Sequence, residues 1–268
     1  MASEPVPGGE SAFHKPDGSE RRFLVVGNSH VTAFFRAAES RRQSGDPTQI
    51  HAVHVRSEKY RPELQVDDGK PRLGDRLVAD LTQMKEGGAL LVSCVGGNRH
   101  NVLGLMQHSR PFDFVLAEAP DLPLQKGFEV VPTALLESLL RELARKEMLM
   151  LSALKELDPG VIHLESPPPV RDSGFILANA GVYFHERGIE SIGVTPHWVR
   201  YKLWRLYSGI TRAVCGELGI TFIENPEGIV DPEGFLLPCA IQDATHANAW
   251  YAEKVISGIE SRYRDRQI

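Results

Sequence analysis

The alternation of short β-rich runs with helical patterns is the feature that most constrains the fold of this chain. Runs rich in apolar and β-branched residues occupy 22–26, 50–55, 89–95, 161–165 and 220–223. Several are apolar almost throughout, as expected for parallel strands covered on both faces. The pattern predicts an α/β protein: a three-layer α/β/α sandwich built on a flavodoxin-like, doubly wound sheet of about five parallel strands.

Helical patterns separate these runs, and no linker or internal repeat divides them. They cover 31–42, 73–85, 132–157, 196–218 and about 247–264. Pro132 is well placed as the first residue of the longest one. We therefore expect a single domain over 21–268. The segment 1–20 is rich in Gly, Pro, Ser and charge, and predicts a disordered leader.

The composition excludes several classes of function. A net charge of -5 lacks the basic excess of a nucleic-acid-binding face. No apolar window approaches the length of a membrane helix, and residues 1–20 lack the apolar core of a secretory signal. We therefore expect a cytoplasmic protein with neither a nucleic acid nor a membrane as partner. The oligomeric state is left open.

Ligands of such sheets bind beyond the carboxyl ends of the strands, so polar residues that directly follow a strand are candidate site residues. Gly27-Asn28-Ser29-His30 follows the first run and precedes a helix. A serine here lies beside the free N–H groups of the first helical turn, which favour a developing negative charge. The simpler role for Ser29 is an N-cap.

Two further segments have the same character. Gly96-Gly97-Asn98 follows the third run, and the Asn98 amide can donate to an oxyanion, although an ordinary glycine turn also fits. Asp243 and His246 precede the last helix. Asp243 can accept from one imidazole nitrogen and leave the other to take a serine proton. The alternative is a capping Asp or Thr with a surface histidine nearby.

In this order, these segments resemble the sequence blocks of the SGNH (GDSL-like) hydrolase family. The first block appears as Gly27-Asn28-Ser29, the third as Gly96-Gly97-Asn98-Arg99 and the fifth as Asp243-Ala244-Thr245-His246-Ala247-Asn248. The second block supplies one glycine before a helix. Gly74 is similar, and Gly69 competes with it.

The resemblance implies a serine hydrolase with Ser29 as nucleophile, His246 as base and Asp243 as the residue that orients it. The Ser29 and Gly74 N–H groups and the Asn98 amide would bind the oxyanion, and no metal or organic cofactor is expected. Asn28, His30, Gly97 and Arg99 would contact the substrate. Asn28 and Arg99 each replace an Asp of the family pattern. Arg99 would favour an anionic substrate, unless it points into solvent.

The expected reaction is hydrolysis of a small acyl ester, an O-acetylated carbohydrate among the candidates. Two alternatives remain open: an O-acyltransferase using the same site, and a catalytically idle module that binds an ester or glycan. The segment 99–129 is expected to be a lid or pocket wall with solvated His100 and His108. The helix over 197–205 is expected to bury its Trp and Leu side chains and keep its Arg and Lys side chains in water; stacking on a sugar or capture of an anion is the alternative.

Overall fold

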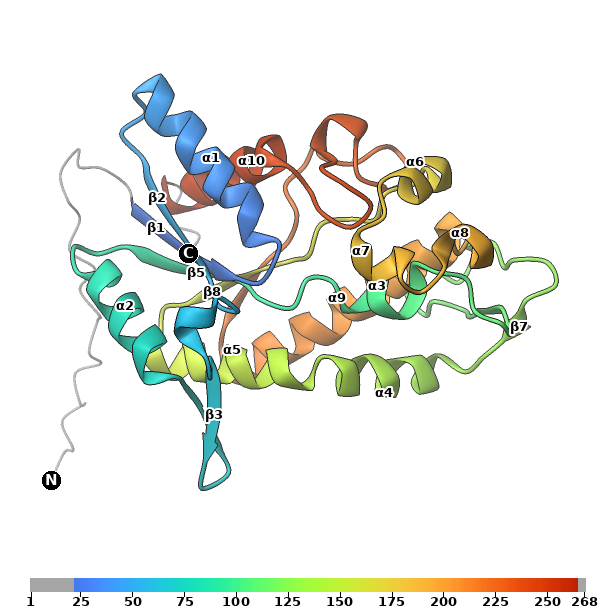
Figure 1. Cartoon of the computed structure of the whole chain (residues 1–268), viewed down its shortest axis with the longest axis horizontal. Coiled ribbons are helices and arrows are strands. Elements are labelled where there is room, and N and C mark those ends of the chain that lie inside the picture. Colours follow the sequence, from blue (N-terminus) through green and yellow to red (C-terminus); the bar gives the residue numbers. More distant parts are fainter. Residues whose placement is uncertain (1–21, 265–268) are drawn as a thin grey trace, which may run out of the picture.

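The computed structural model describes residues 22–264, and its centre is a sheet of five parallel strands (Figure 1). The strands are β1 (Arg22–Gly27), β2 (Gln49–His54), β5 (Leu90–Cys94), β8 (Ile162–Leu164) and β9 (Thr221–Ile223). Their order is β2-β1-β5-β8-β9, which is the flavodoxin-like order when only these strands are counted. The predicted fold class is confirmed. The predicted leader over 1–20 lies outside the described residues.

Helices cover both faces of the sheet. One face carries α1 (Val31–Ser44) and α10 (Ala249–Arg264), and the other carries α2 (Asp75–Lys85), α5 (Arg145–Leu157) and the second half of α9 (His197–Leu218). Alternate residues of β1 serve the two cores: Phe23 and Val25 pack on the α1 side, Leu24 and Val26 on the other. All four are buried, as a strand covered on both faces requires.

The segment after β5 folds into a side lobe rather than an open loop. It contains α3 (Arg99–Gly104), β6 (Phe112–Asp113), β7 (Glu129–Val130) and α4 (Thr133–Leu143), which pack on the first half of α9. The single helix expected over 132–157 is two helices, because the backbone bends at Ala144 (φ -96°, ψ 3°). The two helices bury different cores: α4 packs in this lobe, and α5 packs on the sheet.

Two cations of α9 correct the expectation that its Arg and Lys side chains stay in water. Lys202 is fully buried, pairs with the equally buried Asp113 and donates to the Phe114 carbonyl at 3.0 Å. Arg200 is also buried and donates to the carbonyls of Val170 (2.9 Å) and Arg171 (2.8 Å). These side chains hold the two flanking segments against α9, because a buried charge must be paired or hydrogen-bonded.

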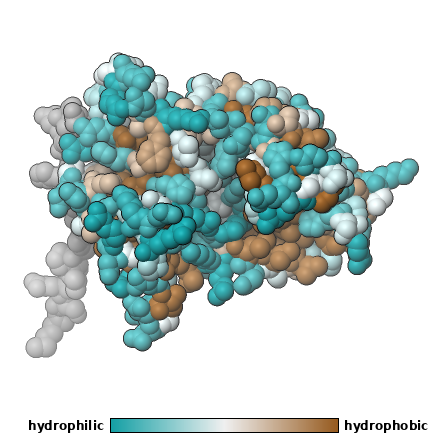
Figure 2. Space-filling view, viewed as in Figure 1, coloured by the Kyte–Doolittle hydropathy of each residue, from teal (hydrophilic) through white to brown (hydrophobic). Residues whose placement is uncertain are grey.

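The remaining elements are short. The turn η1 (Glu58–Tyr60) and the hairpin of β3 (Leu64–Asp67) and β4 (Lys70–Leu73) join β2 to α2, and the hairpin projects away from the sheet (Figure 1). Between β8 and the last helix lie α6 (Ser173–Ala178), α7 (Val182–His185), α8 (Ile189–Ile192) and η2 (Pro238–Ala240). Figure 2 shows apolar side chains at the surface over α4, where Leu135 and Leu139 are exposed. None of the helices within 22–264 has the length and apolar character to cross a membrane.

Candidate active site

The carboxyl ends of three strands bring the predicted site segments to one edge of the sheet. Gly27, the last residue of β1, lies opposite His54 of β2 and Cys94 of β5. The Asn28-Ser29 turn therefore starts beside the segment that runs from Val95 to Asn98. This placement follows from the parallel register alone, and it is where ligands of doubly wound sheets bind.

Ser29 occupies a turn that begins the helical hydrogen bonding before α1 itself starts. The N–H of Val31 donates to the Asn28 carbonyl and that of Thr32 to the Ser29 carbonyl, both at 3.1 Å. The N-cap residue of α1 is His30, and its side chain makes no capping hydrogen bond. Among residues 22–264, neither the hydroxyl nor the N–H of Ser29 has a hydrogen-bond partner, so both are available to a ligand. An N-cap role for Ser29 is therefore not supported.

Asp243 and His246 form the pair that their spacing predicts. His246 Nδ1 lies 2.9 Å from Asp243 Oδ1 and 3.0 Å from Oδ2. Oδ1 also accepts the N–H groups of Thr245 (2.9 Å) and His246 (3.0 Å). Burial alone would raise the pKa of the Asp243 carboxyl, but the bonds from His246 and Thr245 outweigh it, and the net pKa is lowered. Asp243 thus stays ionised and orients the imidazole.

The second nitrogen of His246 is left without a bond within residues 22–264. Nε2 is buried and has no partner among the described residues, and no hydrogen bond joins it to Ser29. In ligand-free enzymes such contacts often tighten only when substrate binds. An unpartnered imidazole nitrogen inside a protein is costly, and such groups concentrate at functional sites.

His30 lies buried beside His246 rather than at the surface, where a residue that contacts substrate was expected. Its ring is buried and lies 5.0 Å from the ring of His246, centroid to centroid. Burial, helped by the nearby His246 and His100, lowers the pKa of His30 to about 3. His30 is therefore neutral near pH 7. The expectation of direct substrate contact is corrected, because burial leaves the side chain only its neighbours.

Asn98 presents the donor end of its amide. It directly precedes α3, and its Oδ1 accepts the Nδ2 of Asn101 at 2.6 Å. This bond engages the carbonyl end of the Asn98 amide, so the amino end is left to donate. Asn101, which is buried, is a positioning residue that the sequence did not single out.

Glycines 96 and 97 are required by close packing. Gly96 has a φ of +87° and accepts the hydroxyl of Tyr207 on its carbonyl at 3.2 Å. A Cβ at Gly97 would lie 2.7 Å from His30 Cδ2 and 3.0 Å from its Nε2. The absence of a side chain at Gly97 therefore lets this turn pack closely on His30, whose ring lies beside that of His246.

Replacing Gly97 by alanine tests this packing. Because the new methyl group would displace His30 and through it His246, we expect kcat/KM for an ester to fall by at least about tenfold, with about 1–3 kcal/mol lost from the free energy of unfolding. Gly181→Ala is the matched control, since a Cβ there meets nothing within 4 Å. Ester kinetics and thermal melts measure both effects. Equal behaviour of the two variants would contradict the packing argument.

Neither glycine named for the second block is an available oxyanion donor. The Gly74 N–H donates to the Glu63 carbonyl at 3.1 Å, and this glycine packs against the Pro62 carbonyl at the start of α2. Gly69 lies in the turn of the β3–β4 hairpin, with a φ of +80°. The expectation for Gly74 is corrected because its donor is already used. The Ser29 N–H and the Asn98 amide remain.

Arg99 and Asn28 border the same edge on its α5 side. Arg99 pairs with Glu147, a buried carboxylate of α5 to which Arg56 also donates at 2.9 Å. Arg99 is therefore not a free arginine in solvent. Asn28 lines a small hollow together with Arg56 and Glu147. Glu147 carries no sequence signal of its own, because it lies within an ordinary amphipathic helix.

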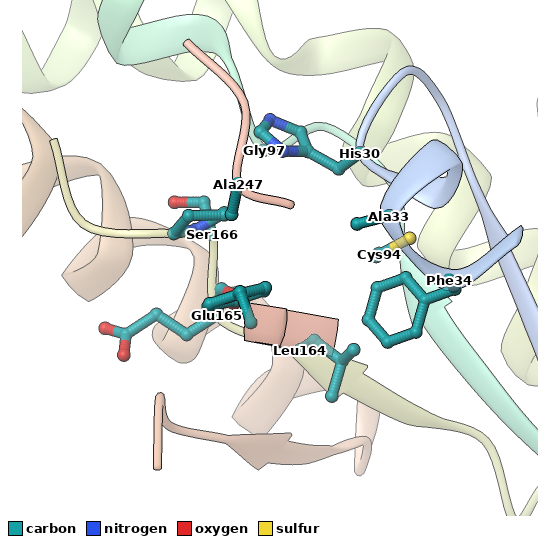
Figure 3. A pocket seen from close by; sticks show the side chains of 11 residues that line it. His30, Ala33, Phe34, Cys94, Gly97, Leu164, Glu165, Ser166 and Ala247 are labelled. Atoms are coloured by element: carbon teal, nitrogen blue, oxygen red, sulfur yellow. The ribbon is translucent and has the colours of Figure 1, made fainter. Parts of the chain in front are cut away.

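A small hollow lies behind His30, between α1 and the ends of β5 and β8 (Figure 3). His30, Ser166, Phe34 and Leu164 are among the side chains that border it. Its volume is about 10 Å³, room for one water molecule. His30 Nε2 and Ser166 Oγ are buried without partners. Ser166, in the loop after β8, thus borders the hollow together with His30.

Two other histidines differ from each other. His100 is buried beside Tyr207 (ring centroids 5.9 Å apart), which corrects the expectation that it is solvated, and burial lowers its pKa to about 3. His108 is exposed, as expected. Across the described part of the chain, no three His, Cys, Asp or Glu side chains are grouped so that they could hold a metal ion.

The protein is thus a three-layer α/β/α sandwich. At the carboxyl edge of its parallel sheet, His246 is paired with Asp243 and the hydroxyl of Ser29 is unbonded among the described residues. No family model and no curated protein matches the chain. Solved structures with a similar chain path include a GDSL-like lipase from Bacteroides thetaiotaomicron (12% identity, 96% of this chain and 94% of that chain covered, TM-score 0.42).

Another is the carbohydrate acetylesterase Est24 from Sinorhizobium meliloti (13% identity, 92% of this chain and 99% of that chain covered, TM-score 0.41). A third is an aryl esterase from M. smegmatis (13% identity, 91% of this chain and 99% of that chain covered, TM-score 0.43). These are likenesses of chain path alone.

Proposed function

We propose that this chain is a serine esterase that hydrolyses short acyl esters through Ser29, His246 and Asp243. The observation that carries the proposal is the His246–Asp243 pair, whose second nitrogen is buried and unpartnered at the edge where the Ser29 hydroxyl is also unbonded. An N-cap serine and a surface histidine would show neither feature. An O-acetylated carbohydrate is the substrate class we favour.

The reaction is an acyl transfer in two halves. Ser29 Oγ attacks the ester carbonyl while His246 Nε2 takes its proton, and Asp243 holds the imidazole and stabilises its charged form. The Ser29 N–H and the Asn98 amide donate to the oxyanion. His246 then gives the proton to the departing alcohol oxygen. Water hydrolyses the acyl-serine by the same steps and restores the hydroxyl.

The tight packing around the site favours a short acyl group. The hollow behind His30 has a volume of about 10 Å³, which is room for about one water molecule. A long acyl chain would have to displace packed side chains to bind there.

Hydrolysis of 4-nitrophenyl acetate, butyrate and octanoate by the purified protein tests the proposal. We expect turnover of the acetate with a kcat/KM at least about tenfold above that of the octanoate, because only the short acyl group fits without repacking. Release of 4-nitrophenol at the buffer rate for all three esters would overturn it.

Asn98→Ala tests the oxyanion assignment. Loss of one such donor typically lowers kcat by about 10²–10³-fold, with little change in KM, because the bond strengthens in the transition state. The control is Asn179→Ala, which removes an amide bonded only to the Phe175 carbonyl at the end of α6. Steady-state kinetics of both variants on the acetate ester decide the matter. A loss below about threefold for Asn98→Ala would remove Asn98 from the mechanism.

A further inference from the structure

Two arginines stand beside the proposed nucleophile on the α2/α5 side of the sheet edge. The Val55 N–H donates to the Gly27 carbonyl at 3.0 Å, so Arg56 follows directly on the segment next to the Asn28-Ser29 turn. Arg99 follows the proposed oxyanion donor Asn98 in the chain. Both cations therefore come from the ends of strands that border the site.

The two guanidinium groups share a single carboxylate oxygen. Arg56 Nη2 lies 2.9 Å from Glu147 Oε1, and Arg99 Nη2 pairs with the same oxygen. Neither guanidinium makes any other hydrogen bond within residues 22–264. Each has five N–H donors, so most of them have no protein partner. The Arg56 side chain is 44% exposed and open to a ligand.

The charges of this cluster do not balance. Lys146 pairs with Glu63, with 2.7 Å between Nζ and Oε1, and Glu63 also lies close enough to Arg56 for that cation to lower its pKa. The cluster as a whole sets three cations, Arg56, Arg99 and Lys146, against the two carboxylates of Glu63 and Glu147, which leaves one cation in excess. A guanidinium fork is matched to a carboxylate, which it can bind through two parallel N–H bonds.

Glu147 adds a second, independent sign of a ligand. Its Oε2 is buried and has no hydrogen-bond partner among the described residues, and Glu147 lines the hollow that Asn28 and Arg56 also line. A buried carboxylate oxygen without a donor is costly. A hydroxyl group placed in this hollow would supply that donor.

We propose that Arg56, Arg99 and Glu147 form a subsite for the alcohol portion of the substrate, and that this portion carries a carboxylate and hydroxyl groups, as an acylated acidic sugar does. The inference rests on the proposed function, because it takes Ser29 as the attacking residue. The arginines bind the carboxylate, Glu147 Oε2 accepts a sugar hydroxyl, and the ester lies over Ser29.

Two esters of nearly the same shape, which differ in the charge of one substituent, measure how much a negative charge on the substrate contributes to binding. 3-Acetoxybenzoate carries a carboxylate where 3-acetoxybenzamide carries a neutral amide. The Ser29→Ala protein cannot turn either over, so calorimetry measures their binding alone. We expect the benzoate to bind about tenfold more tightly at low salt, and this advantage to shrink as ionic strength rises. Equal binding of the two esters would overturn the subsite.

Arg56→Gln and Arg99→Gln, each made in the Ser29→Ala protein, should reduce the benzoate-to-benzamide ratio to about threefold or less. Each single variant leaves one arginine on Glu147, so the carboxylate stays paired and thermal melts should show a folded protein. Arg72→Gln removes an exposed cation of the β3–β4 hairpin and should leave the ratio unchanged. An unchanged ratio in both Arg56→Gln and Arg99→Gln would place the anion elsewhere.

Failure of this inference is distinguishable from failure of the esterase proposal. Turnover of both esters by the unaltered protein, lost in Ser29→Ala, together with equal binding, would retain the esterase and remove the subsite. Preferential binding of the benzoate without turnover of either ester would retain an anion-binding subsite and overturn the esterase.

Discussion

Ser29→Ala is expected to lower kcat/KM for 4-nitrophenyl acetate by about 10⁴-fold or more while the protein stays folded. Removing a serine nucleophile leaves only the rate enhancement from binding and from the oxyanion donors. The Ser29 hydroxyl bonds to no other group among the described residues, so its loss should change the melting temperature little.

The matched control for this variant is Ser138→Ala. Ser138 lies on the exposed face of α4, and its hydroxyl donates only to the Ala134 carbonyl. Its variant should retain full activity. Residual activity of Ser29→Ala within tenfold of the unaltered protein would mean that another group attacks the ester.

His246→Ala should cause a loss of similar size, and Asp243→Asn a smaller one. Without the imidazole, no group is placed to take the serine proton. In Asp243→Asn the ring keeps a second neighbour, because Thr245 Oγ1 lies 3.2 Å from His246 Nδ1 and can help to orient it. We expect a fall in kcat of about 10⁴-fold or more for His246→Ala.

An exposed pair elsewhere in the chain controls for this substitution. His185, the last residue of α7, contacts Glu190 through its Nδ1 at the surface and lies outside the candidate site. His185→Ala should leave kcat unchanged. A larger loss for Asp243→Asn than for His246→Ala would contradict the assignment of His246 as the base.

The strand pattern predicted the fold because the central strands are buried on both faces. Runs such as 22–26 and 89–95 are apolar almost throughout, as strands of a parallel sheet covered on both faces are. Ser29 and Asn98 each follow a predicted strand. Because the carboxyl ends of parallel strands lie at one edge of a sheet, the strand assignment also predicted that these two residues lie at the same edge. The Asp243–His246 pair followed from its own spacing, because a local loop can place both groups.

What the sequence could not predict depends on contacts between distant segments. Lys202 is buried only because Asp113, almost ninety positions earlier, supplies its counter-ion. Gly74 matched a short motif, but its N–H is taken by Glu63 across an inserted hairpin. The pairing of Arg56 and Arg99 with the buried Glu147 joins three segments, and neither Arg56 nor Glu147 lies in a distinctive local pattern.

The most direct test of the central claim is labelling of the purified protein with a fluorophosphonate, followed by peptide mapping of the adduct. The proposed mechanism predicts a single adduct on Ser29, formed by attack of its hydroxyl oxygen on phosphorus with loss of fluoride, and no adduct in the His246→Ala protein. A protein that remains unlabelled, or one labelled at a different serine, would contradict the claim that Ser29 is an activated nucleophile.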